Sequence, residues 1–193
     1  MPEDFGAWSL GLKLRRLLYS VLPEKSTLLE LGSGKGTQEL AKYYNIISIE
    51  DNEYWLSQCD TCCIHAPIRN GWYDPVVIRD ELSGIDYDAI LIDGPTGEGA
   101  RNGFVDFAYL FNLDGWVFID DVNRAKDWEL YMAVRKIVGF DRTAKAFCED
   151  YNKAFGVICP SWEHSELGYI YVKLGLEVYN PYKGAKNDCA TCY

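Results

Sequence analysis

Three alternating glycines and two acids near the start of the chain have the spacing of a nucleotide-type binding turn. Residues 28–36 read LLELGSGKG, an apolar run that leads into the glycines and then into the helix-like segment TQELAKYY. A strand, a tight turn and a helix N-terminus in this order let the backbone approach a ligand closely. The next apolar run, IISIE, ends in Glu50, 20 residues after Glu30, about where an acid that binds ribose hydroxyls is expected.

The acid ahead of the glycines distinguishes this turn from a pyrophosphate site. The pattern is ExGxGxG with Glu30 first, whereas dinucleotide folds favour GxGxxG and bind a pyrophosphate at the helix N-terminus. A carboxylate at the strand end would repel a pyrophosphate, but it could accept a hydrogen bond from the amino group of a cationic ligand or from nearby backbone. The pattern therefore favours S-adenosylmethionine, which has an adenosine, an ammonium and a sulfonium but no phosphate.

Acids also end two later apolar runs, where they could act as metal ligands. Asp93 follows DAILI, and Asp120 and Asp121 follow WVFI. Paired acids beside an apolar strand are costly to bury unless a cation or hydrogen-bond donors compensate them. Three such acids on neighbouring strands would suit Mg²⁺ with open positions for water and substrate. The alternative is that Asp93 is a turn residue and that the pair caps the following turn and helix.

With these residues the chain resembles the class I S-adenosylmethionine-dependent methyltransferases, over roughly residues 26–174. The first strand and glycine loop of that family match LLELGSGKG, the acid of its second strand matches Glu50, and the acid of its fourth strand matches Asp93. The family's acid on the third strand is not evident, and CCIHAP offers His65 in its place. The cofactor-binding residues implied by the resemblance are Glu30, Gly32, Ser33, Gly34, Gly36, Glu50, Asp51, His65 and Asp93.

The paired acids extend the resemblance to the metal-dependent O-methyltransferases, of both the catechol and the macrolide-sugar type. In that branch, acids after the fourth and fifth strands bind the metal, and the matching positions here are Asp93, Asp120 and Asp121. The resemblance implies that Asp93 and Asp121 are catalytic, because a metal held there would align the acceptor and lower the pKa of its hydroxyl. The match is incomplete, since no lysine closely follows the first acid and Asn123 replaces the histidine of the sugar type.

These resemblances imply an S-adenosylmethionine-dependent methyltransferase that methylates a hydroxyl of a small molecule or a sugar, with Mg²⁺ as a candidate second cofactor. One alternative is an enzyme similar to the aminopropyltransferases, which would use Asp93 as a base on an amine. The other is a non-catalytic subunit that binds the cofactor without turnover. The acceptor itself cannot be identified because specificity is determined by loops.

Apolar runs alternate with helical repeats along the chain, which predicts a doubly wound α/β fold. We expect a seven-stranded, mostly parallel sheet with helices on both faces and an antiparallel C-terminal hairpin. Residues 1–25 should form a helix that covers the cofactor or acceptor site, residues 26–175 the methyltransferase domain, and residues 176–193 a mobile tail. Three strand-like pieces, one more than the hairpin needs, end the sequence: AKAFCE, AFGVIC and GYIYVKL.

Composition limits the class of protein and its partners. A chain of 193 residues with 48% hydrophobic residues suits one globular domain. The net charge of −10 opposes the broad basic surface that long nucleic acids require. No apolar stretch is long enough for a membrane span, and the acidic start MPEDFGAW is unlike a secretory signal. We therefore expect a cytoplasmic protein, while its oligomeric state stays open.

Seven cysteines include two CxxC pairs. Cys59 and Cys62 form the first, and Cys189 and Cys192 form the second, near the chain end. Their number and spacing could complete a tetrahedral Zn²⁺ site. The pairs are far apart in sequence and the first leads into an apolar run, so reduced thiols are the preferred interpretation.

Overall fold

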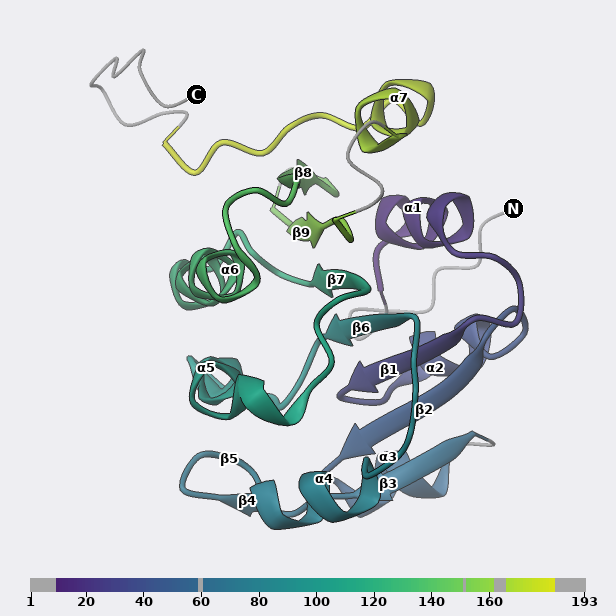
Figure 1. The fold of residues 1–193 in the computed structure, drawn as a ribbon, viewed down its shortest axis with the longest axis vertical. Helices are drawn as coiled ribbons and strands as arrows, with labels where there is room; N and C mark the ends of the chain where they lie inside the picture. The colour runs from purple at the N-terminus through teal and green to yellow at the C-terminus, as the bar shows by residue number, and fades with distance from the viewer. Residues whose placement is uncertain (1–9, 59–60, 151, 162–165, 183–193) are drawn as a thin grey trace.

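A mostly parallel sheet forms the centre of the molecule (Figure 1). The computed structural model describes residues 10–58, 61–150, 152–161 and 166–182, and within these ranges the sheet has seven strands in the order β3-β2-β1-β6-β7-β9-β8. Among the described strands of this sheet, β9 alone runs in the opposite direction to the others. The strands are β1 Thr27–Leu31, β2 Asn45–Glu50, β3 Cys62–His65, β6 Ala89–Ile92, β7 Trp116–Ile119, β8 Ala144–Cys148 and β9 Ala154–Ile158. The predicted fold class is confirmed.

Helices cover both faces of this sheet. Apolar residues of α4, α5 and α6 pack on one face, and those of α1, α2 and α7 pack on the other. Figure 1 shows α5 and α6 to the left of the sheet and α1 to its right. The helices are α1 Leu12–Val21, α2 Lys35–Leu40, α3 Glu53–Ser57, α4 Pro75–Glu81, α5 Gly103–Phe107, α6 Ala125–Val138 and α7 Glu166–Lys173, with 3₁₀ turns η1 Ala100–Asn102 and η2 Ala108–Leu110.

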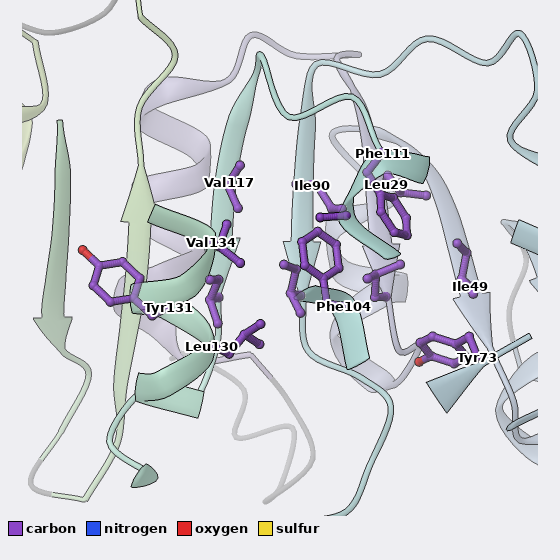
Figure 2. Packing of buried hydrophobic residues seen from close by; sticks show 14 of the residues in the cluster. Leu29, Ile49, Tyr73, Ile90, Phe104, Phe111, Val117, Leu130, Tyr131 and Val134 are labelled. Atoms are coloured by element: carbon purple, nitrogen blue, oxygen red, sulfur yellow. The ribbon is translucent and has the colours of Figure 1, made fainter. Parts of the chain in front are cut away.

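Strand periodicity divides the core between the two faces. Leu29 of β1 belongs to the cluster under α5 and α6, whereas Leu28 points to the opposite cluster. Figure 2 shows the first cluster, in which Phe104 of α5 lies over Ile90 of β6. Because both faces are apolar, the central strands read as continuous apolar runs, and the polar ends of these strands become conspicuous in the sequence.

The first helix packs against the sheet. Three leucines of α1, Leu14, Leu17 and Leu18, are fully buried in the second cluster. Leu10, just ahead of the helix, lines the cavity described below. Residues 1–9 lie outside the described residues, so the expectation that this segment covers the ligand stays a prediction.

The strand-like segment GYIYVKL is helical. Residues 168–173 of this segment belong to α7, in which Leu167 is buried and Ile170 packs against the second cluster, as does Leu174 just after the helix. Aromatic and β-branched residues made this segment resemble a strand, but its apolar residues recur at helical spacing. The hairpin therefore consists of β8 and β9, and the strand interpretation of the third piece was wrong.

A short hairpin and the C-terminal segment were not anticipated as ordered structure. The strands β4 Ile68–Arg69 and β5 Trp72–Tyr73 pair across Asn70-Gly71, whose positive φ angles fit a tight hairpin turn. Glu177 O accepts a hydrogen bond from Cys148 N, so residues 177–179 run along β8. Residues 183–193 lie outside the described residues, and the mobility of that part stays a prediction. No helix in the described ranges combines the length and apolar character needed to cross a lipid bilayer.

Candidate active site

A cavity of about 630 Å³ lies at the C-terminal edge of the parallel strands. The glycine loop after β1 and residues 50–52 after β2 form one end of its wall, which we call the glycine end. Residues 93–99 after β6 and the acid pair after β7 form the other, which we call the acid end. Open parallel sheets bind ligands at this edge, because strand ends and helix N-termini converge there.

The glycine loop touches the loop after β6 through its backbone. Gly32 has a φ of +89°, and a Cβ at this position would lie 2.8 Å from Gly94 N. A Cβ on Gly36 would lie 3.3 Å from Leu10 N, which is also tight. Glycine is therefore required at position 32 for both conformation and space.

Glu30 is linked to the glycine loop by hydrogen bonds through Thr37. Its Oε2 accepts hydrogen bonds from Thr37 Oγ1 at 2.7 Å and Ser48 Oγ at 2.9 Å. Thr37 Oγ1 in turn accepts from Gly34 N at 2.9 Å. Burial raises the pKa of Glu30 to about 7, although both hydroxyls oppose the shift. Glu30 lines the cavity, and these contacts give it a role in shaping the loop.

Glu50 joins the ends of β1 and β2. Its Oε2 accepts from Ser33 N at 2.7 Å and from Ser33 Oγ at 3.3 Å. Its Oε1 accepts from Asp51 N at 3.0 Å and Asn52 N at 2.8 Å. The carboxylate is thus oriented by three main-chain donors, and the neighbouring Asp51 and Asn52 also line the cavity.

The acid end brings together the three predicted metal ligands. One carboxylate oxygen from each of Asp93, Asp120 and Asp121 lies within 4.8 Å of the other two. Lys153, in the turn between β8 and β9, places Nζ 2.7 Å from Asp120 Oδ2 and 3.5 Å from Asp121 Oδ1. The opposite oxygen, Asp120 Oδ1, is buried and has no hydrogen-bond partner among the described residues.

Arg101 of η1 bridges the same acids. Its Nη2 lies 2.8 Å from Asp93 Oδ1 and 3.4 Å from Asp121 Oδ2. Its Nη1 donates to the main-chain oxygen of Asp120 at 3.1 Å and lies 3.6 Å from Asp127 Oδ1. The guanidinium therefore links the ends of β6 and β7 to the first turn of α6.

The pKa values of Asp93, Asp120 and Lys153 are all raised, the first two mainly by burial and the third by the neighbouring carboxylates. Burial and the charge of Asp120 raise the pKa of Asp93, against the opposing effect of Arg101. Burial also raises the pKa of Asp120, although Lys153 opposes the shift. Burial would lower the pKa of Lys153, but the carboxylates of Asp120, Asp121 and Asp93 together outweigh it and the pKa is raised. All three groups hold their protons more tightly, as expected where carboxylates outnumber cations.

Asp121 has an unusual backbone conformation. Its φ is +59°, in the left-handed region that aspartate tolerates better than most residues. Its Oδ2 is fixed by Arg124 Nη2 at 2.8 Å, and its main-chain oxygen accepts from Arg124 N at 2.9 Å. This conformation and these contacts fix the position of the Asp121 carboxylate, which lies beside those of Asp93 and Asp120.

Three residues of the cavity wall were not predicted from the sequence. The sequence did not predict that Arg101 and Lys153 pair with the acids, and it gave Tyr73 no role. The Tyr73 hydroxyl is buried at the cavity wall and has no hydrogen-bond partner among the described residues. The Asn70-Gly71 turn could have predicted the hairpin of β4 and β5, which places Tyr73. No sequence signal marked Arg101 or Lys153, since each is a single cation in a polar segment.

His65 and Cys62 are not among the described residues that line the cavity. His65 pairs in register with Glu50, but its side chain is exposed and is not among the residues that line the cavity. Cys62 is exposed at the start of β3. Cys59, Cys189 and Cys192 lie outside the described residues, so the zinc hypothesis stays a prediction.

Of the comparisons with known proteins, only the one with solved structures found matches, and these support the fold. No protein-family model matches the sequence, and no curated protein matches it. A TehB-like methyltransferase dependent on S-adenosylmethionine, from Corynebacterium glutamicum, is 16% identical with a TM-score of 0.52, covering 77% of this chain and 87% of that one. An rRNA methylase from Streptococcus thermophilus is 15% identical with a TM-score of 0.51, covering 80% and 99%.

A third solved structure extends the comparison. Fibrillarin from Aeropyrum pernix, in complex with natively bound S-adenosyl-L-methionine, is 13% identical with a TM-score of 0.50, covering 76% of this chain and 74% of that one. The chain thus has the fold of the class I S-adenosylmethionine-dependent methyltransferases. The resemblance drawn from the glycine loop, Glu50 and Asp93 is confirmed at the level of the fold.

Proposed function

We propose that this protein is an S-adenosylmethionine-dependent methyltransferase that acts on a hydroxyl of a small molecule or a sugar. The observation that carries the proposal is the single cavity wall shared by the glycine loop, Glu50 and Asp93. These residues come from the ends of three adjacent strands, β1, β2 and β6. The methyltransferase fold, also found in a fibrillarin structure that holds S-adenosyl-L-methionine, supports the same conclusion.

The cavity suits the cofactor in size, and its glycine end suits the cofactor in chemistry. The cavity volume of about 630 Å³ lies within the range of small-molecule sites, roughly 300 to 1,000 Å³. The contact from Ser33 Oγ to Glu50 is the longest of the four at that carboxylate, so a ribose hydroxyl could replace it. The buried Tyr73 hydroxyl offers a further uncommitted group to the ligand.

The acid end fits an acceptor site. The bound cofactor would supply a methyl group already activated on a sulfonium, so the protein has mainly to align the acceptor. Asp93, at the junction of the two ends, has a raised pKa and could accept a proton from an acceptor hydroxyl. Asp121, held by Arg101 and Arg124, would position that hydroxyl.

The acceptor is proposed to be small. The net charge of −10 and the carboxylates at the acid end disfavour a long polyanion at this site. An rRNA methylase is among the structural neighbours, but proteins that share a fold need not share a substrate.

A divalent ion such as Mg²⁺ is proposed as an aid to the reaction. Asp93, Asp120 and Asp121 would hold it, because three carboxylates suit a hard cation and the buried Asp120 Oδ1 lacks a partner among the described residues. Bound there, the ion would polarise the acceptor oxygen.

Calorimetry with S-adenosylmethionine and S-adenosylhomocysteine tests the proposal directly. Wild-type protein should bind both, and Gly32→Ala should bind far more weakly, because its Cβ would clash with Gly94 N. Gly84→Ala is the matched control, since Gly84 also has a positive φ but has open space around it. Equal binding by the two variants, or no binding by wild type, would contradict the proposal.

Turnover assays separate the alternatives. Methyl transfer to a small hydroxyl acceptor from a panel of sugars and catechols is the expected result. Transfer only from decarboxylated cofactor to an amine would indicate an aminopropyltransferase. Binding without turnover on amine, hydroxyl and RNA acceptors would indicate a non-catalytic subunit.

A further inference from the structure

The ammonium group of Lys153 contacts carboxylate oxygens of the same acids that would bind a divalent ion. The ammonium of Lys153 contacts Asp120 Oδ2 and Asp121 Oδ1, at 2.7 and 3.5 Å. Both acids belong to the oxygen cluster proposed above for Mg²⁺. An ammonium and a metal ion cannot both bind these oxygens closely, because their charges repel.

Arginine and lysine divide the carboxylate oxygens between them. Arg101 contacts Asp93 Oδ1 and Asp121 Oδ2, whereas Lys153 contacts the other oxygen of Asp121 and one of Asp120. The second oxygen of Asp120 is buried without a partner among the described residues. Departure of Lys153 alone would therefore free oxygens on two acids and leave the contacts of Arg101 intact.

The two cations differ in how firmly they are held. The Arg101 side chain is 7% exposed and also donates to the main-chain oxygen of Asp120. The Lys153 side chain is 23% exposed and reaches the acids through a flexible unbranched stem. The backbone of Lys153 is fixed in its turn, where its oxygen accepts from Glu149 N and Asp150 N. Lys153 can thus swing its ammonium into solvent without unfolding the hairpin.

Charge balance favours such an exchange. The ion pairs at this end join four carboxylates to three cations, a formal charge of −1. Replacement of one ammonium by a divalent ion would make the cluster neutral. The residues in the cluster are Asp93, Asp120, Asp121, Asp127, Arg101, Arg124 and Lys153.

We propose that Lys153 is an exchangeable counter-ion of the acid end, so that a divalent cation binds Asp93, Asp120 and Asp121 only when the Lys153 ammonium leaves. The inference rests on the metal site of the proposed function and adds a residue that competes with the metal. Without the ion, Lys153 keeps the buried carboxylates compensated. With the ion, the same side chain is released at the cavity rim.

Titration with Mn²⁺, counted by electron paramagnetic resonance, tests the exchange without any activity assay. Lys153→Met should bind Mn²⁺ roughly tenfold or more tightly than wild type, because the competing charge is gone. Lys126→Met is the matched control: Lys126 lines the same cavity but pairs with Glu129, so its removal should change the affinity by less than about twofold. Lys153→Gln should behave like Lys153→Met.

A second substitution locates the ion. Adding Asp120→Asn to Lys153→Met should abolish the gained affinity, since the buried Asp120 oxygens would no longer carry a charge. Circular dichroism confirms that each variant is folded. The inference is overturned if Lys153→Met binds Mn²⁺ no better than wild type, whether both bind or neither does, or if the gain survives Asp120→Asn.

Calorimetry with S-adenosylmethionine on the same samples separates this inference from the proposed function. A wild type that binds the cofactor while Lys153→Met gains no Mn²⁺ affinity would refute the exchange alone. A wild type that does not bind the cofactor would refute the proposed function, and the Mn²⁺ result would still decide the exchange.

Discussion

The two ends of the cavity compensate their acids in opposite ways. At the glycine end, Glu50 accepts from main-chain N–H groups, including those of Ser33 and Asn52. At the acid end, carboxylates pair with the side chains of Arg101 and Lys153. Both ends bury acids at the edge of the same sheet, but only the acid end compensates them with cationic side chains.

This difference separates a preformed end from an adjustable one. Main-chain donors at the glycine end are fixed by the pairing of β1 with β2, so they cannot leave when a ligand arrives. A lysine side chain can leave, and its loss exposes charge that another cation can compensate. The glycine end should therefore determine cofactor affinity, and the acid end should determine which ion and acceptor are accepted.

The largest effect is expected from Arg101→Met. It removes a buried cation from three carboxylates, which should lower the free energy of unfolding by about 3 to 5 kcal/mol. Urea unfolding measures the change. Arg79→Met is the control, since Arg79 is exposed and pairs with its neighbour Asp80. Equal stability of the two variants would show that the acid end does not need its arginine.

The pH dependence of stability should reveal Glu30. Its folded pKa of about 7 exceeds the usual value of an unfolded glutamate. The protonated form is therefore favoured by folding, and its stabilising contribution is lost as pH rises from about 4.5 through about 7. Relative to Glu30→Gln, the wild type should lose roughly 3 kcal/mol over this window.

Urea unfolding of both proteins at several pH values measures this loss. The exposed Glu24 provides the control, because Glu24→Gln should follow the wild-type pH profile. A constant difference between wild type and Glu30→Gln across the window would show that Glu30 does not titrate as its burial requires.

Glu50→Gln should weaken cofactor binding by about 2 kcal/mol, roughly thirtyfold. The amide loses the charge that attracts the main-chain donors of the glycine loop, so the preformed end loosens. Calorimetry with S-adenosylhomocysteine gives the affinity. Glu53→Gln, an exposed acid in α3, should bind like wild type. If both variants bind equally well, the glycine end is not the cofactor site.

The smallest effect is expected from Tyr73→Phe. Its hydroxyl lies at the cavity wall without a hydrogen-bond partner among the described residues, and its loss should weaken cofactor binding by about 1 kcal/mol, roughly fivefold. Tyr131→Phe is the control, because Figure 2 shows Tyr131 at the opposite edge of the same apolar cluster. Unchanged affinity in Tyr73→Phe would assign that hydroxyl no part in binding.

The sequence predicted more of the glycine end than of the acid end. Residues 28–36 and Glu50 form one local unit, because β1, its turn and β2 are consecutive and their spacing is visible along the chain. Asp93 and the acid pair were found because they interrupt apolar runs. Their partners were not found, since Lys153 lies in a hairpin turn 32 residues after Asp121 and nothing local marks it.

Sequence alone determined the sheet, the glycine loop and the positions of the acids, because hydrophobic periodicity and turn chemistry are local properties. Tertiary structure alone determined which cations face those acids, that Tyr73 reaches the cavity wall, and that His65 does not. Those outcomes depend on how the hairpin, η1 and the β4–β5 turn pack around the sheet edge, and packing joins residues whose distance in sequence carries no signal.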